Sequence, residues 1–544
     1  MMDRRKFVGI ILLAFSILIP GWLIFLREDH PRLSSYLRTD EEIATFIGDA
    51  LPTNDVFLIQ VTFNGYALFR DENSSAFYYS LIENDPDAYD PFVRYEGTNK
   101  RVKMALLEGE ITPEAIEQNR PLRLIASDGK HYREYRLYCT TLPLMNIDSD
   151  ILLFNWKDKE RDMAMTLFDN RAGVRQRLVS MSGLIRLRGN STMYYAKKGY
   201  KITLNQTSLG NHTREYDQPL LGMDSRTDGE WLLYSAYNDQ ERIRNVFSSN
   251  LWFTGNAGAN RFGIKNGMEY RYLELFLNGE YWGLYALGYP LDSKQMLPET
   301  DSRAVKNIYM FKKIYWEPED APFDETIPVR DFEVRGKDAL AHEAEARALL
   351  AAYDRWIRDG APESERDQLP VEAELSNAID VWLFVNLIQG MDMVKPSGGF
   401  FNMFVTIAET DNGSVLLYTP WDLDMTWGNY WIEEEANFTV PYMLSPEDNS
   451  FIMLRNPATF LLPGRTEEIK SRYAELRRTV WSDESLDRML AGYRSRIFDS
   501  GAYRRDIERW PDSTSEDPDL KLSLFTDYVR SRLRALDDFV DQLD

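Results

Sequence analysis

The sequence contains one cysteine and four histidines among its 544 residues. With Cys139 alone, no disulfide can form within the chain and no zinc cluster of cysteine ligands is available. Cys139 lies in YREYRLYCTT, an alternating run that predicts a strand, so we expect a buried thiol. The histidines form no HxH or HxxxH pair, which leaves histidine-based metal hydrolysis without support. They are His30, His131, His212 and His342.

Basic residues are in the minority. The chain has 63 Lys and Arg against 86 Asp and Glu, a formal net charge of -23. Nucleic-acid-binding proteins usually present a basic face, so we expect no nucleic acid as a partner. Hydrophobic residues make up 44% of the chain and aromatic residues 13%, which is typical of a folded globular protein and excludes disorder of the whole chain.

One long apolar run, residues 7–26, carries no charge. A helix of about 20 residues crosses the apolar core of a bilayer, so this run predicts a transmembrane anchor. Arg4, Arg5 and Lys6 precede it, which predicts a cytoplasmic N-terminus and an extracytoplasmic main part, at the cell surface or in the periplasm. A cleaved signal peptide is the alternative, but the run lacks an A-x-A-like cleavage site.

Hydrophobic periodicity divides the rest of the chain. Six strand-like runs predict a small β-sandwich: VFLIQVTF, YALFR, AFYYSLI, RVKMALLEG, LRLIAS and HYREYRLYC. Strands and helices mix after it and predict an α+β domain with a strand-rich and a helix-rich lobe. Asn278-Gly279 predicts a hairpin, and Asn238 with Asp239 is expected to cap a helix that continues to about Trp252. The expected divisions are 1–6 cytoplasmic, 7–26 transmembrane, 27–54 juxtamembrane, 55–141 β-sandwich and 142–544 the α+β domain, with helices at 341–358 and 377–388 and a polar break at Pro511–Pro518.

Two aspartates, Asp422 and Asp424, follow an apolar strand in YTPWDLDMTWGN. Alternate residues of a strand face the same side, so the two carboxylates converge if the extended conformation continues that far. Convergent carboxylates at a strand end suit Mg²⁺, which takes oxygen ligands and phosphate oxygens. An acidic loop that arose by chance is the alternative.

Upstream, Asp392 follows an apolar helix and Asn402 begins the next predicted strand. An acid, then an amide, then a carboxylate pair is the order of parts used in kinase phosphoryl transfer, where one Asp orients the hydroxyl while the Asn and a later Asp hold metal. As an alternative, Asp392 is a turn residue and Asn402 only begins a strand.

A polar turn between two predicted strands precedes several lysines. Backbone N–H groups and cations in such a turn can cover phosphates, although the turn is neither a P-loop nor a GxGxxG motif. A basic hairpin on the surface is the alternative. The turn comprises Arg188, Gly189, Asn190 and Ser191, and the lysines are Lys198 and Lys201.

In this order, the three elements resemble the CotH family, the spore-coat protein kinases and their relatives. The resemblance covers roughly residues 142–540, and PWDLDMTWG and NGEYWGLY carry it most specifically because both spacing and aromatics match. It implies an atypical protein-kinase-like fold, with ATP and Mg²⁺ (or Mn²⁺) as cofactors. The other matching stretches are LRGNSTMYYAKKGYKITL, WLLYSAYNDQERIRNVFSSNLW and LELFLNGEYWGLYALGYPLD.

The resemblance also implies roles for individual residues. Where relatives usually carry Glu, this chain has Gly288-Tyr289-Pro290, so Tyr289 is expected to stack on the base. Asp392 and Asn402 are ten residues apart, against about five in ordinary kinases. The implied roles are catalysis for Asp392 and Asp424, nucleotide binding for Arg188, Gly189, Asn190, Ser191, Lys198, Lys201 and Tyr289, and metal binding for Asn402, Asp422 and Asp424.

Two functions remain at this point. One is Mg²⁺-dependent transfer of phosphoryl from ATP to Ser or Thr of a surface or coat protein, with nucleotidyl transfer as a sister reaction. The other is a non-catalytic, pseudokinase-like surface scaffold that binds protein or glycan. A metallohydrolase ranks last because no histidine accompanies the acidic pair.

Overall fold

The computed structural model describes most of the chain. The predicted cytoplasmic end and membrane segment, residues 1–26, lie outside the described part. Within that part, no helix has both the length and the apolar character that a bilayer crossing requires. The described residues are 31–71, 73–153, 159–189, 191–205, 219–226, 228–292, 294–296, 305–314, 328–336, 340–359, 363–366, 368–390, 393, 402–411, 413–429, 443, 464–513 and 517–544.

The chain divides into two compact units. The first unit comprises Met1–Ala67, Asp90–Leu107 and Ile125–Arg133, and the second Leu68–Tyr89, Glu108–Leu124 and Glu134–Asp544.

The first unit contains a three-stranded sheet of order β3-β2-β6. Thr39 and Glu42 form a capping box that begins its short helix, since each side chain accepts from the other's backbone N–H. Strand β6 has no counterpart among the predicted strands. The elements are η1 (Leu33–Tyr36), α2 (Asp40–Ile47), β1 (Leu51–Pro52), β2 (Leu58–Phe63), β3 (Tyr66–Ala67) and β6 (Val93–Gly97).

A further sheet has the order β4-β5-β9-β8-β7. Its β9 carries Cys139, which is buried as the alternating pattern predicted, and burial raises the pKa of that thiol to about 12. The predicted run YALFR is two strands, β3 and β4, rather than one. The elements are β4 (Phe69–Asp71), β5 (Ala76–Ser80), β7 (Lys103–Glu108), α3 (Pro113–Glu117), β8 (Leu122–Ser127) and β9 (His131–Thr140).

Seven strands of the second unit close into a barrel, because β10 pairs in parallel with β15. The predicted hairpin at Asn278-Gly279 is confirmed. Both residues have positive φ (54° and 73°), as a type I′ turn requires. The elements are β10 (Leu144–Ser149), η2 (Ile151–Leu153), β11 (Arg161–Phe168), β12 (Leu178–Arg188), η3 (Ser191–Met193), β13 (Gly199–Asn205), β14 (Glu230–Tyr234), β15 (Arg271–Leu277) and β16 (Glu280–Gly288).

A five-stranded sheet of order β18-β17-β20-β21-β19 follows in the second unit. The helices predicted at 341–358 and 377–388 are confirmed as α6 and α8, and α8 is buried along nearly its whole length. The elements are β17 (Val305–Lys313), β18 (Phe332–Arg335), α6 (Glu343–Arg358), α7 (Glu363–Arg366), β19 (Val371–Ala373), α8 (Leu375–Ile388), β20 (Met403–Thr410) and β21 (Gly413–Pro420).

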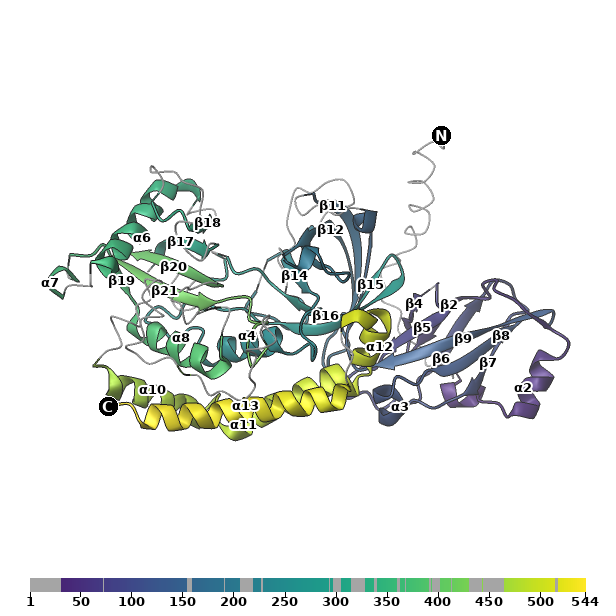
Figure 1. Ribbon diagram of the computed structural model, residues 1–544. Coiled ribbons are helices and arrows are strands. Elements are labelled where there is room, and N and C mark those ends of the chain that lie inside the picture. The colour runs from purple at the N-terminus through teal and green to yellow at the C-terminus, as the bar shows by residue number, and fades with distance from the viewer. Residues whose placement is uncertain are drawn as a thin grey trace. The chain divides into compact units, whose positions relative to one another are not determined.

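Helices complete the second unit. Figure 1 shows α13 as a long helix with α10 and α11 beside it, and α13 also packs on α8. The predicted break at Pro511–Pro518 is confirmed, since α13 begins at Pro518. The unit therefore has the mixed α+β character that the sequence predicted. The helices are α4 (Arg244–Gly255), α10 (Thr466–Arg478), α11 (Asp483–Arg494), η6 (Ser495–Asp499), α12 (Ala502–Arg509), η7 (Pro511–Ser513) and α13 (Pro518–Asp541).

Candidate functional site

The antiparallel ladder of β20 and β21 brings Asn402 next to the acidic run. Met403 pairs with Pro420 at the end of the ladder. One residue further, the backbone N–H of Trp421 donates to the backbone carbonyl of Asn402 over 3.0 Å. Asn402 therefore lies directly beside Trp421-Asp422, although the whole hairpin of β20 and β21 separates them along the chain.

Strand alternation would make the two carboxylates converge only if the extended conformation continued through the acidic pair, and it does not. Strand β21 ends at Pro420, and Asp422 has a φ of 60°, in the left-handed region that non-glycine residues seldom adopt. Strand alternation therefore does not set the directions of Asp422 and Asp424. Asp422 is exposed and Asp424 half-buried. A left-handed backbone at a polar residue persists where the surrounding contacts hold it.

Those contacts come from helix α4. The Asn245 side-chain oxygen accepts from the backbone N–H of Leu423 over 2.9 Å. One turn along, the Ser248 hydroxyl accepts from the Trp427 indole N–H over 2.8 Å, and Trp427 is fully buried. The loop that carries the two aspartates is thus fixed to a helix far away in sequence.

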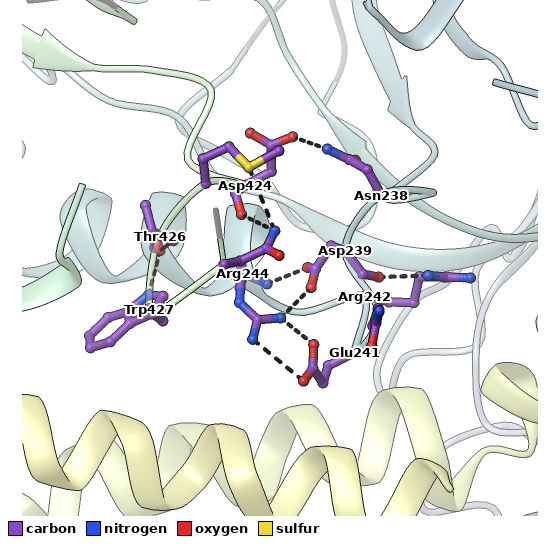
Figure 2. Close-up of polar contacts among 12 residues, drawn as sticks. Asn238, Asp239, Glu241, Arg242, Arg244, Asp424, Thr426 and Trp427 are labelled. Atoms are coloured by element: carbon purple, nitrogen blue, oxygen red, sulfur yellow. Dashed lines mark hydrogen bonds and ion pairs between the residues drawn. The ribbon is translucent and has the colours of Figure 1, made fainter. Parts of the chain in front are cut away.

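Asn238 holds the second aspartate. Its side-chain amide donates to the Asp424 carboxylate over 2.6 Å, as Figure 2 shows. From the other side, the Asn429 amide donates 2.9 Å to the backbone carbonyl of Asp424. Asn238 was expected only as a helix cap, and its place beside Asp424 had no signal in the sequence.

Helix α4 begins at Arg244, five residues after Asp239, so the expected helix start was too early. The reason is that Asp239 caps from a distance. Its carboxylate accepts from the Arg244 backbone N–H over 2.6 Å and pairs with the Arg244 guanidinium at 2.8 Å. Glu241 pairs with the same guanidinium, and Figure 2 shows Arg244 between the two carboxylates. Burial raises the pKa of Asp239, and the Arg244 charge offsets part of that shift.

The aspartates of the acidic loop help to raise the pKa of two tyrosines. Burial, and then the carboxylates of Asp424, Asp239 and Asp422, raise the pKa of Tyr234 well above its ordinary value. Burial and Asp424 likewise raise the pKa of Tyr195, whose ring stacks on Tyr237 at 5.3 Å. Both carboxylates of the acidic loop thus contribute to the raised pKa of one buried phenol, Tyr234.

The polar turn after β12 is built on one glycine. Gly189 has a φ of 102°, and a Cβ there would come within 1.7 Å of the Thr192 hydroxyl oxygen. That hydroxyl donates to the Arg188 carbonyl over 3.0 Å, which closes the turn. Lys198 donates to the Met193 carbonyl over 2.6 Å. The turn is thus held by its own contacts, with Ser191 at the start of η3.

The lysines of this region are engaged away from the aspartates. Lys198 is bonded within the turn, and burial lowers its pKa. Lys201 pairs with Glu230 on the neighbouring strand β14. Lys197, which had no assigned role, is fully buried and pairs with Asp506 at 2.6 Å. A phosphate-binding role for Lys198 or Lys201 stays a prediction.

A small pocket lies where the turn, helix α4 and the acidic loop meet. Its volume is about 20 Å³, which suits a water molecule. Arg188 and Asp422 contribute its charges, and the tyrosines Tyr234 and Tyr270 line one side. The remaining lining residues are Asn245, Ser249, Met268, Pro420 and Trp421.

Tyr289 is fully buried. Its hydroxyl lies 3.0 Å from the Ser225 hydroxyl, and its ring meets Trp231 edge-on. Stacking on a base requires the Tyr289 ring, or the residues that bury it, to move. Asn190 and Asp392 lie outside the described residues, so their predicted roles stay predictions.

The oxygen donors fit a hard cation. Asp422, Asp424 and Asn402 offer carboxylate and amide oxygens, the ligand types that Mg²⁺ takes in combination with phosphate. In the described ranges, no group of three or more His, Cys, Asp or Glu side chains is placed so that it could hold a metal ion by itself.

Comparison with known proteins identifies a family. The model of the family described as CotH kinase protein matches residues 185–536. The match spans the turn after β12, helix α4, the acidic loop and most of α13. No curated protein matches the chain.

Proposed function

This chain belongs to the CotH kinase protein family, and we propose that it transfers the terminal phosphoryl group of ATP to serine or threonine of a surface or coat protein. Membership indicates a kinase-related function that uses a nucleotide and a metal ion in general. The observation that carries the finer proposal is the meeting of Asn402 with Trp421-Asp422, with Asp424 held beside them by Asn238.

Each residue has a proposed part in the reaction. Asp422, Asp424 and Asn402 would hold Mg²⁺, which would supply positive charge against the phosphates. Arg188 and the backbone of its turn contact the phosphates. The acceptor hydroxyl oxygen bonds to the terminal phosphorus as the bridging P–O bond breaks, ADP leaves, and Asp392 takes the hydroxyl proton. Catalysis of this kind is positioning plus electrostatic stabilisation.

A thermal-shift titration tests the proposal. The full-length chain, purified in detergent, is titrated with ATP and Mg²⁺ or Mn²⁺ beside Asp424→Asn. A ligand that binds only the folded state raises the melting temperature with its concentration. We expect a metal-dependent shift that is lost in Asp424→Asn and kept in Asp411→Asn, an exposed aspartate at the opposite end of the same hairpin. Absence of a shift in the wild-type chain contradicts the proposal.

The second candidate is a non-catalytic scaffold for protein or glycan. Two observations favour it: the pocket is small, and Lys198 and Lys201 are engaged elsewhere. Transfer of the labelled terminal phosphoryl group of ATP to a protein acceptor separates the two candidates, since a scaffold transfers no phosphoryl group.

We further propose that residues 7–26 anchor the chain in a membrane and hold the main domains outside the cytoplasm. The basic residues Arg4, Arg5 and Lys6 support this orientation. Protease added to intact cells is expected to digest the main domains. Removal of residues 1–26 is expected to abolish membrane association, and a truncated chain that still sediments with membranes contradicts the anchor.

A further inference from the structure

Two cations meet at the ring of Trp421, the residue just before Asp422. The Arg188 guanidinium carbon lies 5.4 Å from the ring centre and the Lys312 ammonium nitrogen 6.0 Å from it. Arg188 ends β12 of the barrel, whereas Lys312 belongs to β17 of the five-stranded sheet. Two different sheets thus each place a cation within 6.0 Å of the ring of the residue that precedes the acidic pair.

Lys312 differs sharply from the lysine next to it. Lys313 is buried and paired with Asp331. Because successive residues of a strand point to opposite faces, Lys312 lies on the other side of β17. It is half-buried, and across the described part of the chain its ammonium group makes no hydrogen bond or ion pair. Its contact with the Trp421 face is therefore its principal interaction.

The charges around Lys312 leave its ammonium group poorly compensated. Burial lowers the pKa of Lys312, the Asp422 carboxylate opposes that shift, and the Arg188 charge adds to it. The other charged neighbours, Glu333 and Arg335, pair with each other at 2.6 Å. An anion placed between Lys312 and Arg188 would compensate both cations at once.

We propose that Lys312 and Arg188 form a phosphate-binding site over Trp421 and that its ligand is the polyphosphate chain of a nucleotide. The inference rests on the proposed function, since Asp422 at the same place is a proposed metal residue. A guanidinium binds two phosphate oxygens in a fork, and an ammonium group acts as a mobile point charge, so the two complement each other. Lys312 takes here the phosphate-binding role that the sequence suggested for Lys198.

Ligands that carry different numbers of phosphate groups test this assignment. Affinities of the full-length chain for ATP, ADP and adenosine are measured by titration calorimetry with Mg²⁺. The main variant is Lys312→Met, which keeps the apolar stem over Trp421 and removes the charge, and Lys312→Arg restores a charge. Lys306→Met is the matched control, because Lys306 lies on the same strand, is exposed and pairs with Asp411.

We expect Lys312→Met to weaken ATP binding by about 10- to 100-fold, the effect of losing one charge-assisted hydrogen bond, and to leave adenosine binding unchanged. Lys312→Arg is expected to recover much of the loss, and Lys306→Met to bind as the wild type. ATP binding that is unchanged in Lys312→Met but lost in Asp424→Asn overturns this inference and leaves the proposed function standing.

Pyrophosphate separates the inference from the proposed function in the opposite case. If ATP fails to bind the wild-type chain but pyrophosphate raises its melting temperature and does not raise that of Lys312→Met, the phosphate site stands and the kinase proposal falls. If neither ligand acts on the wild-type chain, both are overturned.

Discussion

The ammonium nitrogen of Lys197 lies 2.6 Å from a carboxylate oxygen of Asp506, 309 residues further along the chain, and neither side chain is exposed. The other oxygen of Asp506 accepts from Arg242 over 2.9 Å. Lys197 follows the turn after β12, and Arg242 precedes α4. One buried carboxylate on α12 thus ties together the two segments that carry Arg188 and Asn238.

Replacing Asp506 by asparagine should destabilise the protein strongly. The change leaves Lys197 and Arg242 buried without their common counter-charge, and breaking a buried ion pair from one side costs about 3 to 5 kcal/mol. The free energy of unfolding is measured in urea by tryptophan fluorescence. Asp512→Asn, an exposed neighbour, should change it by less than about 0.5 kcal/mol. Equal stabilities of the two variants would contradict the role of Asp506.

The stability contribution of Lys197 should depend on pH. Burial lowers the pKa of Lys197 to about 8 from 10.5, although the Asp506 carboxylate opposes the shift. Between these values the unfolded chain keeps a proton that the folded protein has released. The contribution of Lys197 to the free energy of unfolding therefore increases as the pH rises through that window.

The measurement compares the wild type with Lys197→Met across the same window. The wild type should gain stability relative to the variant as the pH rises from about 8 to about 10. Lys306→Met, in which an exposed lysine is lost, should show no such gain. A stability difference between wild type and Lys197→Met that is constant with pH would show that Lys197 keeps an ordinary pKa.

Asn238→Ala should weaken metal-dependent nucleotide binding with little effect on folding. The amide of Asn238 orients the Asp424 carboxylate, and loss of a group that orients a metal ligand typically costs about 10- to 100-fold in metal affinity. Mg²⁺ dependence of ATP affinity is measured by calorimetry. Gln240→Ala, an exposed neighbour, is the control. Equal Mg²⁺ dependence in both variants would remove Asn238 from the site.

Gly189→Ala should damage the turn more than an ordinary glycine replacement does. The new Cβ meets the Thr192 hydroxyl, and the positive φ adds a backbone cost of about 1 to 3 kcal/mol. Gly173→Ala isolates the backbone cost, because Gly173 has a φ of 75° with no atom within 4 Å of the new Cβ. The free energy of unfolding, measured in urea, should therefore be lower for Gly189→Ala than for Gly173→Ala. The reverse order would contradict the contact with Thr192.

Secondary-structure elements could be predicted from the sequence wherever neighbouring residues determine the backbone conformation. Asn278-Gly279 favours positive φ at both turn positions, so the hairpin followed from two residues. The apolar period of α8 and the polar break before α13 were equally local. The start of α4 could not be predicted in this way, because Asp239 caps the helix from five residues upstream through a folded loop.

The sequence by itself determined the family and the order of Asn402, Asp422 and Asp424. These depend on residue type and spacing, which a linear pattern contains. Tertiary structure alone decided that Asn238 holds Asp424, that α4 fixes the acidic loop, and that Lys312 faces Trp421 while Lys198 bonds within its own turn. The physical reason is that hydrogen bonds and charge contacts act between neighbours in space, and the pairing of distant strands and helices chooses those neighbours.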